Sequence, residues 1–342
     1  MNIAVLMGGI SSERNISLLS GRAVTRALRE RGHTVQAFDP ARGAHAALSD
    51  ADLDAATNAA VTPEELAGFR KEALMECVAS GQLDGVDIVF NLLHGQYGED
   101  GYMQALLHMR GLRFTGSGMT ASAIAMDKGL AKMLFQVSSI PTAHWVTLQG
   151  SDADNLELLE EVRQELKGPV VVKPNDGGST VGMTIVETGD LHDLQAAVKE
   201  AARFTNSIIV ERYVRGREFT VAVLGDEALP VIEIVPHEGT YDYQNKYTKG
   251  RTEYHCPADL EDHVREHMMS LAVTAHRVLG CTTYSRVDFL LTEDQLPVCL
   301  EVNTVPGFTE LSLVPMAAKA VGIGFADLCE DIIHRSLDQQ PH

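Results

Sequence analysis

The sequence predicts an α/β protein with more than one domain. Its 342 residues exceed the roughly 100 to 200 residues of a typical domain. The chain opens with an apolar strand over 2–7, followed by a helical pattern that ends at Gly32 and a second strand over 34–38. Together these elements indicate a βαβ unit. Four apolar residues at helical spacing are expected to face inward: Ile16, Leu19, Val24 and Leu28.

The pattern continues as three units. The first, residues 1–116, has weak helical periodicity over 41–80 and a strand over 86–93. The second, 117–211, is expected to contain helices over 119–137, 154–167 and 189–204 and strands over 144–148, 169–172, 183–187 and 207–214. The third, 212–342, is expected to contain strands over 217–224, 229–235, 284–291 and 297–303, a helix over 260–279 and two helices after Pro306.

Charge and cysteine content exclude several classes of protein. With 28 Lys and Arg against 47 Asp and Glu, the net charge is −19, so nucleic acid binding through the overall field is not expected. A polyanionic ligand must therefore be held by a few local cations. The N-terminus has no signal-peptide pattern, and no apolar run is long enough to span a membrane. The five cysteines are scattered and form no CxxC pair, which is typical of a reduced, cytoplasmic protein.

The segment YSRVDFLLTEDQLPVCLEVNTVPG carries polar residues at strand spacing. Because side chains alternate along a strand, Arg286 and Asp288 share one face, as do Glu301 and Asn303. A hairpin that turns at 294–295 places Asp288 opposite Glu301 and Arg286 opposite Asn303. The opposite, core-facing side is expected to hold Val287, Phe289, Leu300 and Val302.

Two carboxylates that face each other repel, which favours a bound cation between them. Carboxylate and amide oxygens from Asp288, Glu301 and Asn303 suit Mg²⁺. The alternative from spacing alone is a solvated sheet face on which Arg286 bridges the acids.

Residues 170–183, VVVKPNDGGSTVGM, place Lys173 at the end of an apolar strand and before a glycine-rich loop. Backbone N–H groups in such a loop can bind phosphate oxygens, although an ordinary turn between strands fits equally well. Lys128, Lys173 and Lys246 are the cations available for phosphates, and each alone could be a surface lysine.

The opening MGGISSER lacks the GxGxxG pattern, so dinucleotide binding there is only weakly indicated. Glu13 could simply complement the dipole of the first helix, and His94 could be an ordinary loop histidine.

Several distinctive segments follow one another along the chain, each occurring once: MGGxSSER, FNLLHGxxGEDG, FTGSG, MDK, VVVKP followed by GGSTVGM, VERYVRGREFTVAVL, YDYxNKY, RVDF and LEVNTVPGFTELSLVP. Together they resemble the D-alanine–D-alanine ligases of the ATP-grasp superfamily, from Asn2 to about Ile333. The resemblance implies an ATP-grasp fold of three lobes, with a Rossmann-like domain over 1–116, a small central lobe over 117–211 and a C-terminal lobe over 212–342 that carries the metal and substrate site. It also implies a usually homodimeric enzyme that joins two D-alanines for peptidoglycan precursors through a D-alanyl phosphate.

The resemblance implies a set of ligands for ATP and metal. Two Mg²⁺ ions, or Mn²⁺, would be held by Asp288, Glu301 and Asn303. The phosphates of ATP would be bound by Lys128, Lys173 and Lys246. Glu211 and the backbone near Val214 would hold adenine, and Glu218 would hold the ribose.

Roles toward the amino acids are implied in the same way. Glu13 would bind the first ammonium, with His94 nearby. Arg286 and the Gly307 N–H would stabilise the tetrahedral oxyanion. The second carboxylate would lie on Ser312, the Leu313 N–H and Lys246. A hydrogen-bonded triad of Glu13, Ser179 and Tyr247 would close two loops over the site and exclude water.

Competing functions differ in the features that they require. Tyr247 stands where family members that use amine acceptors carry tyrosine, which favours D-alanine over D-lactate. Leu311 falls where some relatives carry histidine, so a D-Ala–D-Ser or other dipeptide ligase is the main alternative. A regulatory nucleotide-binding module would not need the set Glu13, Ser179, Tyr247 and Arg286, and a dehydrogenase is disfavoured by the missing glycine fingerprint.

Overall fold

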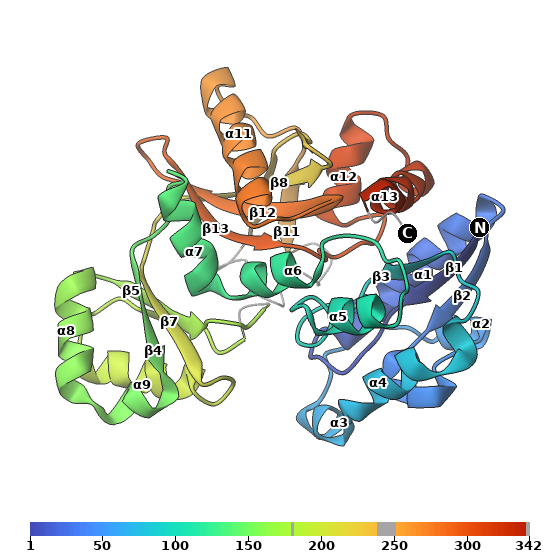
Figure 1. Ribbon diagram of the computed structural model, residues 1–342. Coiled ribbons are helices and arrows are strands. Elements are labelled where there is room, and N and C mark those ends of the chain that lie inside the picture. The colour runs from blue at the N-terminus through green and yellow to red at the C-terminus, as the bar shows by residue number, and fades with distance from the viewer. Residues whose placement is uncertain (179–180, 238–250, 340–342) are drawn as a thin grey trace.

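The computed structural model describes residues 1–178, 181–237 and 251–339, which form three sheets flanked by helices. In Figure 1 the N-terminal sheet lies at the right, the central sheet at the lower left and the third sheet across the top. Within the described part of the chain, no helix combines the length and apolar character that crossing a membrane requires.

The first sheet is parallel, with the order β2-β1-β3, and confirms the βαβ opening. Its strands are β1 (Asn2–Leu6), β2 (Thr34–Phe38) and β3 (Ile88–Asn91). The accompanying helices are α1 (Arg14–Glu30), α2 (Asp50–Asp54), α3 (Pro63–Gly68), α4 (Glu72–Ala79) and α5 (Tyr102–Met109), with 3₁₀ turns at Pro40–His45 and Gly81–Leu83. Ile16, Val24 and Leu28 are buried as expected, whereas Leu19 is only half-buried and lines a cavity.

The central sheet is antiparallel, with the order β4-β7-β5-β6. Its elements are β4 (Trp145–Gln149), a 3₁₀ turn (Gly150–Asp154), α8 (Leu156–Leu166), β5 (Val170–Pro174), β6 (Thr184–Val186), α9 (Leu191–Ala201) and β7 (Ser207–Arg212). Leu159 on α8 and Val172 and Val210 on the sheet are buried in a core that this unit does not share with the other sheets.

The third sheet has the order β11-β10-β8-β12-β13, with β9 beside β8. Its elements are β8 (Arg217–Leu224), β9 (Glu227–Ala228), β10 (Ile232–Pro236), β11 (Thr252–His255), α11 (Asp262–Val278), β12 (Tyr284–Leu291), β13 (Pro297–Asn303), α12 (Leu313–Ala320) and α13 (Phe325–Gln339). Strand β11 was not expected from the sequence. The helices α6 (Met119–Met126) and α7 (Lys128–Val137) pack into the core of this sheet. The domain boundary expected between residues 116 and 117 is not tested by this packing and stays a prediction.

The β12–β13 hairpin has the expected register where the polar residues lie. Asp288 pairs with Glu301, and Arg286 pairs with Asn303. The expectation that Leu300 faces the core is wrong. A β-bulge shifts the register between Asp288 and Phe289, so Phe289 pairs with Cys299 and Leu300 turns toward a cavity beside Glu301.

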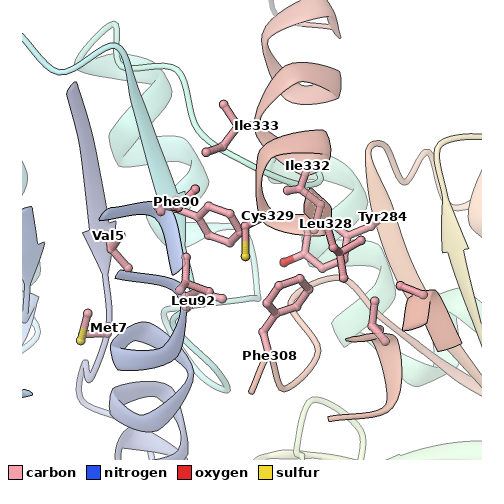
Figure 2. Close-up of a cluster of buried hydrophobic side chains, with 14 of the residues drawn as sticks. Val5, Met7, Phe90, Leu92, Tyr284, Phe308, Leu328, Cys329, Ile332 and Ile333 are labelled. Carbon is pink, nitrogen blue, oxygen red and sulfur yellow. The ribbon is translucent and has the colours of Figure 1, made fainter. Parts of the chain in front are cut away.

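The first and third sheets share one apolar core (Figure 2). Phe308 is fully buried between Phe90 of β3 and Tyr284 of β12, with ring centroids 6.0 and 5.7 Å away. Helix α13 adds Leu328 and Ile332 to the same core. The polypeptide that follows the β12–β13 hairpin is therefore fixed against the N-terminal sheet.

Candidate active site

Two cavities meet at the centre of the molecule. One, of about 420 Å³, lies between the central and third sheets, and the other, of about 520 Å³, lies between the third sheet and the N-terminal domain. Both are lined by Lys128, Gly177, Gly178 and Glu301. A ligand in one cavity can therefore reach a ligand in the other at this junction.

The smaller cavity collects most residues expected to bind nucleotide, Lys128, Lys173, Glu211, Val214 and Glu218, together with two expected metal ligands, Asp288 and Glu301. Strand β7 ends at Arg212, and the N–H groups of Arg212 and Tyr213 bond to the carbonyls of His144 and Pro169. Among the described residues, the next N–H, at Val214, has no backbone partner. This edge can therefore donate to a ring nitrogen of a base.

A buried ionic cluster lies beside this cavity. The Glu211 carboxylate is 2.5 Å from Lys173 Nζ and 2.9 Å from Lys132 Nζ. Burial raises the pKa of Glu211, but the two ammonium groups outweigh it and lower the pKa to about 2. Burial lowers the pKa of Lys132, and Glu211 opposes that shift. Lys132 was not singled out in the sequence, although it follows Lys128 by one helical turn.

Lys128 reaches the junction because the start of α7 is fixed. Asp127 caps the helix by accepting the Leu130 N–H at 2.9 Å. Asn175, directly after β5, accepts the Gly129 N–H and donates to Asp127, both at 2.8 Å. The Lys128 ammonium donates to the Gly177 carbonyl at 2.6 Å and lies 3.4 Å from Glu301.

Asp288 is surrounded by hydrogen-bond donors. Arg286 donates through Nε at 2.9 Å and through one terminal nitrogen at 2.8 Å, and the Asn303 amide donates at 3.0 Å. Thr220 adds a hydroxyl bond at 2.6 Å. Arg286 thus pairs with Asp288, and Lys128 lies near Glu301. This arrangement resembles the alternative considered from the sequence, in which Arg286 bridges the two acids without a metal.

The same face also fits a hard divalent cation. Asp288 and Glu301 pair across the hairpin and supply two carboxylates, and Asn303, whose amide nitrogen donates to Asp288, also carries an amide oxygen. No group of three or more His, Cys, Asp or Glu side chains suited to a metal occurs in residues 1–178, 181–237 and 251–339. A cation here would therefore need the Asn303 oxygen, phosphate oxygens or water to complete its shell.

The larger cavity collects the described residues expected near the amino acids, Glu13, His94, Arg286, Gly307, Ser312 and Leu313, together with the expected metal ligand Asn303. Glu13 is the N-cap residue of α1, yet its carboxylate makes no capping bond. A Cβ atom on Gly178 would lie 3.2 Å from Glu13 Oε2, so the glycine-rich loop approaches this carboxylate closely. Ser179, Lys246 and Tyr247 lie outside the described residues, and the expected triad stays a prediction.

His94 links three segments around this cavity. Its Nδ1–H donates to the Val305 carbonyl at 2.8 Å, and its Nε2 lies 3.3 Å from the Ser20 hydroxyl oxygen. That oxygen accepts the Phe308 N–H at 3.2 Å. Burial lowers the pKa of His94 despite the nearby Glu13 carboxylate. A neutral His94 therefore holds the backbone on both sides of Gly307.

Helix α12 directs its N-terminus at the cavity. Its N-cap, Ser312, makes no side-chain capping bond, because its hydroxyl oxygen accepts the Thr309 N–H at 2.9 Å. The Leu313 N–H is at the first position of the helix, where it has no partner within the helix, so it can bind a carboxylate, which the helix dipole also favours. Leu311 lines the same cavity and is 82% exposed.

Glu99 is a cavity residue that the sequence analysis missed. It accepts the Gly95 N–H at 3.0 Å. Burial, with the charges of Glu13 and Glu301, raises its pKa to about 8. Its position in the GEDG segment, five residues after His94, was the available signal.

Three α/β lobes with a lysine-lined cavity between the second and third sheets define an ATP-grasp protein. The chain belongs to the D-alanine–D-alanine ligase family. Residues 2–117 match the family model described as D-ala D-ala ligase N-terminus, and residues 134–334 match that of the C-terminus.

Individual relatives agree over nearly the whole chain. D-alanine–D-alanine ligase B of Chromobacterium violaceum is 40% identical over 97% of this chain and 96% of its own. The Bacillus anthracis ligase complexed with ATP is 28% identical, with a TM-score of 0.75 over 99% of this chain and 98% of its own. VanG D-Ala:D-Ser ligase from Enterococcus faecalis is 27% identical, with a TM-score of 0.78 over 98% and 99%.

Proposed function

We propose that the protein joins two D-alanines to D-alanyl-D-alanine, with ATP converted to ADP and phosphate, for peptidoglycan precursor synthesis. The observation that carries this proposal is the junction of the two cavities at Lys128, Gly177, Gly178 and Glu301. Nucleotide in the smaller cavity would present its terminal phosphate to a carboxylate in the larger one. Two reactants held in this way react without the entropic cost of a free encounter.

The reaction would proceed in two steps, formation of an acyl phosphate and attack by an amine. A carboxylate oxygen of the first D-alanine attacks the γ-phosphorus of ATP, which forms D-alanyl phosphate and releases ADP. The deprotonated amine of the second D-alanine then attacks the acyl carbon, and the tetrahedral intermediate expels phosphate as the nitrogen loses its extra proton and the peptide bond forms. Arg286 and the Gly307 N–H would stabilise the oxyanion, and the Glu13 carboxylate would bind the first ammonium.

For the nucleotide, Lys128, Lys173 and Lys246 would bind the phosphates, Glu211 and the Val214 backbone would hold adenine, and Glu218 would bind the ribose. Closure over the cavities by Glu13, Ser179 and Tyr247 would exclude water from the acyl phosphate. The open Leu313 N–H and Ser312, with Lys246, would hold the second carboxylate.

We assign the metal site to Asp288, Glu301 and Asn303, with two Mg²⁺ ions, or Mn²⁺, as the cations. Bound cations would neutralise charge on the phosphates during transfer. The expected result is that chelation with EDTA abolishes phosphate release and that added Mg²⁺ restores it. Activity that persists after exhaustive chelation would contradict the assignment.

The acceptor is best tested directly. Phosphate release should be measured with ATP, Mg²⁺ and a panel of D- and L-amino acids, and the products identified by mass spectrometry. We expect D-alanine alone to support turnover and D-alanyl-D-alanine to outweigh the depsipeptide when D-lactate competes. A dominant D-alanyl-D-serine product would instead support the alternative, a D-Ala–D-Ser ligase, to which VanG gives a structural precedent.

We also propose that the enzyme acts in the cytoplasm as a homodimer. Helix α5 of the N-terminal domain exposes Tyr102 and Met109 (62% and 84%), which supports an interface on this domain. Sedimentation equilibrium should give twice the chain mass, and Met109→Glu should shift it toward the monomer. We propose no nucleic acid or membrane partner.

A further inference from the structure

Lys132 has no role in the proposed reaction, yet its surroundings are unusual for a lysine. Its side chain is 0% exposed, and it lines neither cavity. A buried ammonium is costly unless charges and hydrogen bonds offset it. Lys132 donates to the Thr142 hydroxyl at 2.8 Å, lies 2.9 Å from Glu211 and sits 5.9 Å from the Trp145 ring centroid.

Glu211 has two cationic partners of different kinds. Lys173 lies on Oε1 and lines the nucleotide cavity, whereas Lys132 lies beside Oε2 and stays beneath the cavity wall. Before nucleotide binds, Lys173 is therefore engaged by Glu211. To bind phosphate, Lys173 must weaken this contact, and a buried carboxylate left alone would resist that exchange.

The second anchor of Lys132 reaches the third sheet. The Thr142 hydroxyl donates to the Cys299 carbonyl at 2.8 Å, and the Cys299 N–H donates to the Pro141 carbonyl at 2.7 Å. Cys299 lies on β13, two residues before Glu301. The Lys132 ammonium is thus held by contacts with both lobes that do not involve Lys173.

We propose that Lys132 is a positioning residue for nucleotide binding: it remains the counter-ion of Glu211 when Lys173 turns from Glu211 to the phosphates. The inference rests on the proposed function, in which Lys173 binds phosphate. Lys132 itself touches neither substrate nor nucleotide. Its effect is to keep the Glu211 carboxylate paired, so that this buried carboxylate is not left without a counter-ion when Lys173 moves to the phosphates.

The test combines Lys132→Met with Glu211→Gln. We expect Lys132→Met to raise the KM for ATP and the Kd for ADP by about tenfold or more, with the KM for D-alanine within about twofold of wild type. In the Glu211→Gln background no carboxylate needs a counter-ion, so Lys132→Met should change the Kd for ADP at least about fivefold less. Lys199→Met, an exposed lysine paired with exposed Asp154, is the control and should change neither constant.

An unchanged KM for ATP in folded Lys132→Met, or an equal effect of Lys132→Met in both backgrounds, would overturn the proposal. If Lys132→Met does not fold, the double variant carries the test, because it leaves no unpaired buried charge. It should bind ADP with a Kd within about twofold of that of Glu211→Gln alone, and a Kd about tenfold higher would contradict the inference. Calorimetric binding of ADP needs no turnover, so a wild-type protein that fails to ligate D-alanine would refute the proposed function separately.

Discussion

Single charged residues at the junction have several partners, and their substitution has more than one consequence. Asp288 accepts hydrogen bonds from Arg286, Asn303 and Thr220. It therefore orients the arginine that is expected to face the oxyanion, in addition to its expected role as a ligand of the cation. Sequence spacing predicted this pairing because a strand fixes which side chains share a face. It did not predict Lys132 or Glu99, whose environments depend on segments distant in the chain.

Replacing both acids, Asp288→Asn with Glu301→Gln, should lower kcat for D-alanine-dependent phosphate release by about a hundredfold or more, since transition-state charge on the phosphates loses its neutralisation. Steady-state kinetics over a Mg²⁺ titration would measure this. The control is Asp226→Asn, an exposed acid paired with Arg277. A double variant that keeps kcat within about tenfold of wild type would be incompatible with the metal assignment.

Glu99 gives a pH-dependent prediction. Because its pKa is raised from 4.5 to about 8, the folded state holds a proton that the unfolded state releases near pH 4.5. Stability therefore falls as pH rises from 4.5 toward 8, and Glu99→Gln removes this loss. In EDTA, the thermal midpoint of Glu99→Gln should equal that of wild type near about pH 5 and exceed it by a few degrees above about pH 8. Exposed Glu293→Gln is the control, and a gain that does not depend on pH would contradict titration of Glu99 as its cause.

Among the elements, the start of α7 and the bulge in β13 position the residues at the junction of the two cavities. The sequence predicts the first of these features better than the second. The MDK segment indicated a lysine near a helix, but the whole 119–137 stretch read as continuous helical pattern. Asp127 instead ends one helix and caps the next. The bulge that moves Leu300 to the cavity face follows from sheet geometry, and a strict alternation of side chains could not show it.

Asn175→Ala should test the coupling between this helix start and Lys128. Two hydrogen bonds to the α7 terminus are lost, so we expect a stability loss of about 1 to 3 kcal/mol and a several-fold rise in the KM for ATP. Asn155→Ala removes a comparable helix cap on α8, where Asn155 accepts the Leu158 N–H at 3.2 Å. It should lower the thermal midpoint without changing the KM for ATP. Equal KM values for the two variants would argue against the coupling.

At the scale of the whole molecule, the three sheets are not equally independent. The alternation of strands and helices predicted three units, but not which of them share a core. The first and third sheets enclose one core around Phe308, whereas the central sheet has its own. Apolar spacing identifies the buried face of an element but not its partner, because the partner is set by packing between elements that are more than 200 residues apart, such as Phe90 and Phe308.

This division predicts two cooperative units. Phe308→Ala should cost about 3 to 5 kcal/mol and lower amide protection in β1, β3, β12 and α13 together. Leu159→Ala, in the central core, should cost about 2 to 5 kcal/mol and lower protection only in the central sheet and its helices. Leu156→Ala, exposed on the same helix as Leu159, should leave both units unchanged.

Hydrogen exchange followed by mass spectrometry separates these outcomes, because each peptide reports on one unit. Separate cores predict that the central unit unfolds while the first and third sheets remain folded. Equal loss of protection in β1 and β7 after Leu159→Ala would mean that the lobes unfold together. That result would contradict the division into a central core and a core shared by the first and third sheets.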